Sequence, residues 1–300
     1  GPIVTHALGL HALFWMIAAL AMAGILLTMW VVPDSENHVL NRESGMVTGC
    51  FSLVLASPRL LKLNFGIMCL HILLMSTFVA LPGQLEAAGF AAANHWKIYL
   101  VTMLVSFVSV VPFIIYAEVK RRMKRVFLFC VALLLIAEIV LWGAGPHFWE
   151  QVLGVQIFFI AFNLMEALLP SLISKEAPAG YKGTAMGIYS TSQFIGVAIG
   201  GALGGWVDGW FDSQTVFLAG ALLAMVWLLV ASTMQEPPYV SSLRVEIPED
   251  VVLDDALQQR LQEKPGISDV LVVAEERSAY VKIDNKLTNR FEVEQAIKGV

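Results

Sequence analysis

The sequence predicts an all-α polytopic membrane bundle followed by a small α+β domain. Hydrophobic residues make up 57% of the 300-residue chain and charged residues 14%, whereas a soluble globular domain has about 25% charged residues. Long apolar runs recur as far as the pair Pro237-Pro238. Charged residues then become dense: residues 1–242 hold 23 of them, and the 58 residues that follow hold 20. Such a step marks a domain boundary, and the two prolines end the preceding helix.

Seven apolar runs have about the length, roughly 20 residues, that a helix needs to cross a bilayer. Their connections are short apart from one polar stretch at 33–58, and short connections between apolar helices predict an up-and-down bundle. The runs are too long and continuous to be strands of a membrane barrel. The segment 1–8 before them has the composition of the end of another span. The seven predicted spans are 14–32, 60–81, 96–116, 126–142, 152–173, 184–206 and 215–233.

The basic residues predict the orientation, because cytoplasmic loops of membrane proteins are enriched in Lys and Arg. If the stretch 33–58 is cytoplasmic, ten of the eleven basic residues in 1–242 lie on that side, and only Lys97 lies outside. The last span then runs inward. The sequence therefore predicts a multi-pass membrane protein whose small C-terminal domain is cytoplasmic.

The C-terminal segment alternates between strand and helix patterns. Alternating apolar residues predict strands at 243–248, 269–274 and 279–284, and helical patterns cover 254–263 and 290–298. The order β-α-β-β-α is that of a split βαβ unit of the ferredoxin-like kind. A fourth strand is expected after Val300.

Composition and motifs also argue against several classes of function. A net charge of −5 without a basic excess does not suggest a nucleic-acid partner. We find no nucleophile–base set, phosphate-binding loop or ATP-binding motif, so we expect neither an enzyme nor a cofactor. The cysteines at 50, 69 and 130 are too widely spaced to predict a disulfide framework or a metal site. The chain has no initiator Met and no signal-peptide pattern, and we infer that it begins inside a longer protein.

Three short motifs carry a resemblance to a known family. Gly1-Pro2 resembles the end of a Gly-Pro motif on a fifth transmembrane helix. The loop A-E-V-K-R-R-M-K-R-V at 117–126 resembles an acidic-then-basic cytoplasmic loop, with Arg121 where glycine is usual. One predicted span carries glycines with G-x-x-x-G spacing, which lets helix backbones approach closely. Together with the topology, these motifs resemble the drug–proton antiporters of the major facilitator superfamily. The glycines are Gly187, Gly196, Gly200 and Gly204.

The resemblance implies a twelve-helix transporter of the bacterial inner membrane, with its amino-terminal part missing here. It implies proton-coupled efflux of an unidentified small molecule by alternating access, with protons and that substrate as partners. Two alternatives remain open: a uniporter or importer of the same fold, and a membrane-embedded sensor whose bundle presents a ligand-sensing domain. The implied domains are 1–33, the end of the first half; 34–58, the inter-half linker; 59–235, the second six-helix half; 236–242, a linker; and 243–300, the ferredoxin-like domain.

Glu166 is a candidate for proton coupling, because charged residues in the hydrocarbon region are rare and usually functional. Asn163 precedes it by about one turn on the same helix face, and Pro170 removes a backbone hydrogen bond one turn later. Burial would favour the protonated carboxyl, which could take a proton from one side of the membrane and release it on the other. A neutral glutamic acid that only joins two helices is an equal alternative.

Two further titratable side chains lie within predicted spans. Glu138 is on an aliphatic helix nearer the outer surface, where a structural role is favoured over proton coupling. His71 could share a proton relay or line a substrate path, although a lone histidine in a helix is more often structural. Asn64, on the same span as His71, is a candidate for a substrate cavity together with Asn163 and Gln193.

The loop at 117–126 predicts a conformational gate. Glu118 and Arg122 keep the spacing of a charge pair, and in the family such loops stabilise one conformation of the bundle. Rocking of two halves requires contacts that differ between states. The alternative is that these charges set the topology and contact anionic lipid.

The run P-G-I-S-D-V-L-V-V at 265–273 resembles the heavy-metal-associated domain, which binds metal through two cysteines before its first helix. The corresponding loop, 248–252, has no cysteine, so we expect no soft-metal site. The domain is expected to sense a ligand or to associate with a second copy of itself. A passive folded appendage is nearly as plausible, since a fold does not determine a function.

Overall fold

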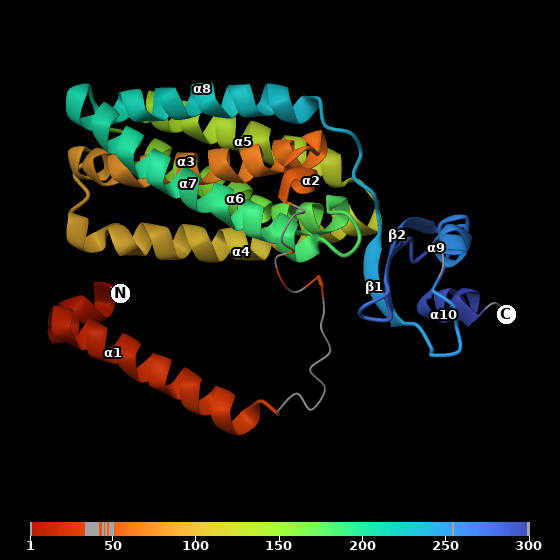
Figure 1. Ribbon diagram of the computed structural model, residues 1–300. Helices are drawn as coiled ribbons and strands as arrows, with labels where there is room; N and C mark the ends of the chain where they lie inside the picture. The colour runs from red at the N-terminus through yellow and green to blue at the C-terminus, as the bar shows by residue number, and fades with distance from the viewer. Residues whose placement is uncertain are drawn as a thin grey trace.

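The computed structural model describes residues 2–33, 42, 43, 45, 47, 51–253 and 255–298. In this part of the chain the helices α3 to α8 form a bundle, the C-terminal domain lies at one end of it, and α1 lies apart (Figure 1). The elements are α1 (Pro2–Val31), α2 (Phe51–Leu55), α3 (Pro58–Ala87), η1 (Ala92–Asn94), α4 (His95–Val119), α5 (Met123–Ala144), α6 (Phe148–Glu176), α7 (Lys182–Trp210), α8 (Ser213–Ser232), β1 (Ser241–Glu246), α9 (Asp255–Gln262), β2 (Ile267–Val273), β3 (Ser278–Ile283) and α10 (Arg290–Lys298).

Six of the described helices are long and apolar enough to cross a membrane: α1 from Leu8, α3, α4 with the preceding η1, α5, α6 and α8. The prediction of seven such spans therefore differs at α7. Glycine, serine, threonine and glutamine make α7 less apolar than its neighbours. It is nevertheless a continuous helix of 29 residues that runs along α3 within the bundle (Figure 1).

Glycines bring α7 against the backbone of α3. A Cβ at Gly200 would lie 2.6 Å from the carbonyl oxygen of Ile72. A Cβ at Gly204 would lie 2.8 Å from the Cα of Ser76, and the α3 backbone crowds Gly196 in the same way. Any side chain at these positions would push the two helices apart, so the G-x-x-x-G spacing is what allows their close contact.

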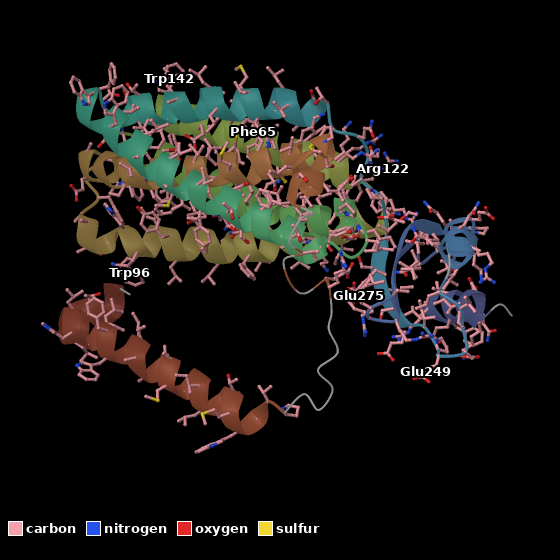
Figure 2. The ribbon with its side chains drawn as sticks, in the orientation of Figure 1. Phe65, Trp96, Arg122, Trp142, Glu249 and Glu275 are labelled. Carbon is pink, nitrogen blue, oxygen red and sulfur yellow. The ribbon has the colours of Figure 1, made fainter. Side chains whose placement is uncertain are left out.

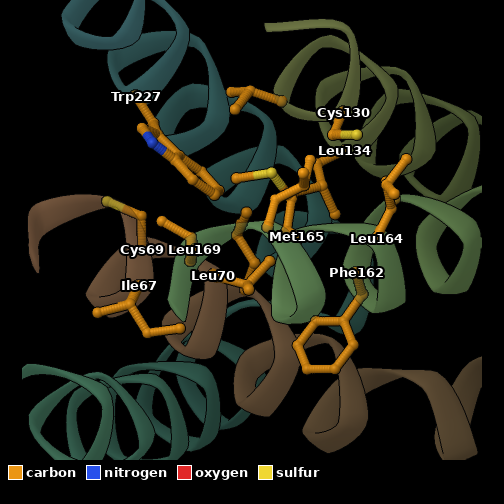
Figure 3. Close-up of a cluster of buried hydrophobic side chains, with 14 of the residues drawn as sticks. Ile67, Cys69, Leu70, Cys130, Leu134, Phe162, Leu164, Met165, Leu169 and Trp227 are labelled. Carbon is orange, nitrogen blue, oxygen red and sulfur yellow. The ribbon is translucent and has the colours of Figure 1, made fainter. Parts of the chain in front are cut away.

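Side chains from α3, α5, α6 and α8 form the core of the bundle (Figure 3). Cys69 and Cys130 are buried in it as free thiols, which is how small apolar residues are used in cores. Trp227 of α8 is almost completely buried, and its ring meets that of Phe127 edge-on, with centroids 6.1 Å apart. This packing fixes the rotation of each helix and so decides which of its residues face away from the core.

The two ends of the bundle differ in composition. Trp96 and Trp142 lie near the end away from the C-terminal domain, and Arg122 lies near the end beside it (Figure 2). We call the second end the basic end; α3, α5 and α7 begin there, and α4, α6 and α8 end there. Its basic residues are Arg59, Lys62, Lys120, Arg121, Arg122, Lys124, Arg125, Lys175 and Lys182.

The C-terminal domain has the predicted β-α-β-β-α order and a three-stranded antiparallel sheet in the order β1-β3-β2. β3 therefore lies between two strands that run parallel to each other, as in a split βαβ unit. One face of the sheet packs on α9 and α10 through Val281 and Ile283, with Leu257 and Val293 from the helices. All six residues of β3 are buried, because its other face is covered as well.

Two local features concern the first part of the chain. Residues 2–8 and the first span are two helical segments of α1, separated by a break at Gly9, whose φ of 83° is in the region that favours glycine. In the polar stretch 33–58, the short helix α2 was not predicted; Val54 anchors it in the core.

Candidate proton-coupling site

The core of the site is a contact between His71 on α3, Gln193 on α7 and Glu166 on α6. The Nε2 atoms of His71 and Gln193 are 2.9 Å apart, which is a hydrogen bond. Nε2 of His71 is also 3.5 Å from Oε1 of Glu166. Three predicted site residues from separate helices therefore meet at one imidazole nitrogen.

The hydrogen bonds of His71 define its neutral tautomer. Its Nδ1 lies 3.2 Å from the carbonyl oxygen of Ile67, and a carbonyl can only accept, so Nδ1 carries the proton. Nε2 is then an acceptor and takes the amide hydrogen of Gln193. A second proton on Nε2 would face the carboxylate of Glu166 and convert the contact into an ion pair.

The three side chains lie near the middle of their helices. Glu166 is ten residues from the end of α6, and His71 is thirteen residues from the start of α3. At 1.5 Å per residue this places them about 15–20 Å from the basic end, roughly half-way across a hydrocarbon layer of about 30 Å.

Burial differs sharply between the two titratable partners. The His71 side chain is 7% exposed and that of Glu166 is 34% exposed. Oε1 of Glu166 is itself buried and makes no hydrogen bond to the described residues. Tyr189 of α7, which sequence reasoning did not select, is buried within electrostatic range of this carboxylate.

An apolar cavity of about 940 Å³ adjoins the site and is lined by α3, α4 and α6 and by Val4 of α1. Phe162 links the two, because it lines the cavity and its ring lies edge-on to His71 with centroids 5.8 Å apart. Asn163 is half-buried beside Phe162, and its amide is 3.9 Å from the sulfur of Met103, which also lines the cavity. The cavity residues are Val4, Leu74, Met75, Phe78, Trp96, Tyr99, Leu100, Met103, Phe159 and Phe162.

Asn64 lies two turns before His71 on α3. It is 6% exposed, and its Oδ1 has no partner among the described residues. Asn64 lies on the same helix face as His71 and remains a candidate for binding a polar group of the substrate, as predicted from the sequence. It does not contact the cluster around His71.

Glu138 lies apart from this cluster. Its side chain is 1% exposed, and Oε1 accepts a hydrogen bond of 2.8 Å from Oγ1 of Thr77 on α3. Gly220 of α8 abuts the other oxygen: a Cβ there would lie 2.6 Å from Oε2. Glu138 thus joins α5 to α3 and α8.

At the basic end, Glu118 forms an ion pair across helices. Its Oε2 is 2.8 Å from Nζ of Lys175 on α6, and Ser171 donates to its Oε1 at 3.3 Å. The structure therefore pairs Glu118 with Lys175 rather than with Arg122, which is the residue directly before α5. A charge spacing within one loop did not reveal this partner on another helix.

Arg121 occupies the position in the α4–α5 loop where glycine is usual in the family that the loop resembles. Its φ of 52° is left-handed, a conformation that glycine adopts most easily. Its guanidinium makes two hydrogen bonds to the carboxylate of Asp284 in the C-terminal domain, one of them 2.8 Å long. Sequence reasoning missed this role, and the only signal was a basic residue at a glycine position.

Comparison with known proteins agrees with this architecture. Residues 1–191 and 119–268 match the Major Facilitator Superfamily, and residues 243–299 match the YajR YAM domain. The chain is 75% identical over 298 residues to the inner membrane transport protein YajR of Escherichia coli (strain K12); the match covers 99% of this chain and 66% of YajR.

A more distant relative is an uncharacterized transporter of Buchnera aphidicola subsp. Acyrthosiphon pisum (strain APS), which is 35% identical over 199 residues. That match covers 66% of this chain and 51% of the relative, so the chain spans about half to two thirds of the length of these two proteins. The predicted fold class, a membrane bundle followed by a ferredoxin-like domain, is confirmed. From the matched residues and the bundle of apolar helices, the chain is a multi-pass membrane protein that belongs to the major facilitator superfamily.

Proposed function

We propose that the longer protein containing this chain is a proton-coupled exporter of a small molecule, working by alternating access. The contact of His71 and Glu166 near the middle of the bundle, 3.5 Å from Nε2 to Oε1, carries this proposal. Transporters of this kind bind substrate and coupling ions near the bilayer midplane. A carboxyl and an imidazole at that depth are costly unless they are used or well paired.

In the proposed cycle, Glu166 takes up a proton from the outside and releases it to the cytoplasm. When the carboxyl is neutral, His71 keeps its neutral tautomer and accepts from Gln193. When the site opens to the cytoplasm, water stabilises the carboxylate, and the proton leaves. His71 can hold that proton on Nε2 in passing, because this nitrogen faces both Gln193 and Glu166.

The aromatic cavity is the proposed binding site for the transported molecule. Its lining is almost entirely apolar, apart from the hydroxyl of Tyr99 and the indole of Trp96, and pockets of this kind bind apolar ligands with a few polar groups. Asn163 contacts Met103 of the cavity lining, Gln193 bonds His71, and Asn64 lies two turns before His71 on α3. Binding of a substrate group that hydrogen-bonds these amides would depend on the charge of Glu166.

The ion pair between Glu118 and Lys175 is the proposed gate contact, in place of a pair with Arg122. It joins the ends of α4 and α6 at the basic end, where access from the cytoplasm must open and close. Arg122 keeps the role of the basic residue before α5, where it contributes to topology.

A regulatory role for the C-terminal domain is a second candidate, favoured by its contacts with the bundle. Lys282 of β3 reaches the last turn of α6, the helix that carries Glu166. A pure sensor would use that contact without moving protons or substrate, whereas an exporter needs both. A uniporter or importer of the same fold would move substrate without counter-flow of protons.

The test uses the full-length protein in lipid vesicles that contain a pH-sensitive dye, with an imposed pH gradient and a panel of cationic and neutral export substrates. Proton flux and substrate flux are recorded for the wild type, Glu166→Gln and Glu138→Gln. We expect the wild type and Glu138→Gln to exchange protons for substrate, and Glu166→Gln to lose the coupling. Equal coupling in all three proteins would exclude Glu166 as the carrier, and an absence of flux in the wild type would favour the sensor.

A further inference from the structure

The sheet of the C-terminal domain has one face for its own helices and one for the bundle. In β3, Ala279, Val281 and Ile283 pack on the domain core. The alternate residues Tyr280 and Lys282 point the other way and are 0% and 3% exposed. An isolated domain would leave the second set in water, so the bundle is what buries them.

Lys282 caps the end of α6. Its Nζ donates to the carbonyl oxygens of Ser174 and Lys175, at 3.1 Å and 2.7 Å. The last carbonyls of a helix have no partner within the helix, so the Lys282 amine, charged or neutral, supplies hydrogen-bond donors that they otherwise lack. The cap comes from a separate domain more than a hundred residues further along the chain.

Two further contacts attach the same face of the domain to the loops of the basic end. The backbone amide of Ala179, between α6 and α7, donates to Oδ2 of Asp269 on β2 at 2.7 Å. Asp284, directly after β3, pairs with Arg121 in the α4–α5 loop.

The inter-half stretch is attached there too. The amide of Arg42 donates to the hydroxyl of Tyr280 at 2.8 Å, and the guanidinium of Arg42 lies 5.2 Å from the ring centre of Tyr181 at the start of α7. The docking face of the domain therefore contacts two loops of the second half, the end of α6 and the described part of the stretch between the halves.

Most of these contacts are hydrogen bonds and ion pairs. The apolar part of the face is small: Leu271, Val273 and Tyr280 pack against Ala179 of the bundle. Interfaces between domains of one chain that are polar in this way normally permit relative motion. The contact of Tyr280 with Arg42 in the inter-half stretch would have to change when the two halves rock, because that stretch connects them.

We propose that the C-terminal domain docks reversibly on the basic end through the face that carries Lys282, and that the docked domain acts as a clamp on α6 and slows the change between conformations. The effect on transport rests on the proposed function. The docking itself does not, and it can be measured without any transport.

The charges around Lys282 give docking a pH dependence. Burial lowers the pKa of its amine to about 8, against the opposing effect of Asp269, Glu43 and Glu176; Lys182 lowers it slightly. Water would restore the ordinary value of about 10.4 on release, so the released state binds the proton more tightly. Docking is therefore weakest below pH 8 and strengthens as the pH rises through the window from about 8 to about 10.4. Between pH 7 and pH 9 the docking equilibrium should shift about tenfold towards the docked state.

The amide of Ala179 reports docking directly, because its acceptor belongs to the C-terminal domain. We would measure hydrogen exchange of this amide in the full-length protein from pH 7 to pH 9, divided by the intrinsic exchange rate. In the wild type its protection should rise about tenfold. Lys282→Met should remove this pH dependence, and Lys298→Met, an exposed lysine of α10, should retain it.

A second variant distinguishes release of the C-terminal domain from unfolding of that domain. Arg121→Gly removes the pair with Asp284 and suits the left-handed backbone of the loop. It should speed exchange at Ala179 at every pH and leave the amides of β3 within the sheet protected. Protection of Ala179 that is unchanged in Lys282→Met and Arg121→Gly would overturn the docking proposal. If the Ala179 amide exchanges faster in these variants but substrate turnover is unchanged, the clamp is overturned, whether or not Glu166 proves to be the proton carrier.

Discussion

Nε2 of His71 lies 3.5 Å from Oε1 of Glu166, on a helix 95 positions away in sequence, and the same nitrogen is hydrogen-bonded to Gln193. One imidazole thus faces a carboxylate that is partly exposed and an amide that can donate or accept. The cluster can hold a proton either on Glu166 or on Nε2 of His71, and a proton carrier requires two such states.

His71→Gln should keep the bundle folded and reduce the number of protons exchanged per substrate. A glutamine retains hydrogen-bonding groups for Gln193 and Ile67 but cannot hold a proton. The ratio of proton flux to substrate flux in vesicles measures the effect. His95→Gln is the matched control, since His95 is also buried but bonds only the carbonyl oxygen of Phe90 at 2.9 Å among the described residues. An equal ratio in both variants would remove His71 from the proton path.

Thr77→Val should destabilise the protein by about 1–3 kcal/mol, because it leaves the buried Glu138 carboxyl without its donor. Thr102→Val is the comparison: Thr102 is equally buried, but its hydroxyl bonds only carbonyls of its own helix among the described residues. Thermal unfolding in detergent should show the larger loss for Thr77→Val. Similar losses would mean that the Thr77–Glu138 bond contributes little.

Gly200→Ala should destabilise the bundle by about 1–3 kcal/mol, since a methyl group there would meet the backbone of Ile72 at 2.6 Å. At Gly201, the next residue, a methyl group would have no neighbouring atom within 4 Å. Gly201→Ala should therefore be neutral or slightly stabilising. The melting temperatures of the two variants test this, and a stable Gly200→Ala would show that α3 and α7 do not pack as described.

Glu118→Gln and Lys175→Met should each shift the balance between conformations by up to about fivefold, equivalent to about 1 kcal/mol for a part-buried pair. The double variant should shift it no further, because both changes break one contact. Labelling of a cysteine at the basic end measures which conformation is populated. Arg59→Gln, at the longer pair with Glu176, 3.4 Å against 2.8 Å, should have a smaller effect. If the shift in the double variant equalled the sum of the two single shifts, Glu118 and Lys175 would act independently and not through one contact.

Much of the architecture follows from the chain alone, because the signals are local. An apolar run of about 20 residues is a span whatever surrounds it, and the basic residues orient it. Glu166 was selected for the same reason, since a carboxyl in such a run stands out. The β-α-β-β-α order of the C-terminal domain likewise depends on alternation within short windows. Helix α7 alone among the predicted spans is not apolar enough to count as a membrane span. Its close packing against α3 requires glycines, and these lower its hydropathy.

The partners of these residues were decided by tertiary structure. Which side chains meet between helices depends on the rotation and depth of each helix, and packing over the whole bundle sets both. The sequence could therefore select His71, Gln193 and Glu166 separately but could not place them at one nitrogen. For the same reason Glu118 has its partner on α6, and Lys282, an ordinary lysine in a strand pattern, caps a helix of another domain. Local composition determined what each segment is, and the relative placement of segments determined what each side chain can do.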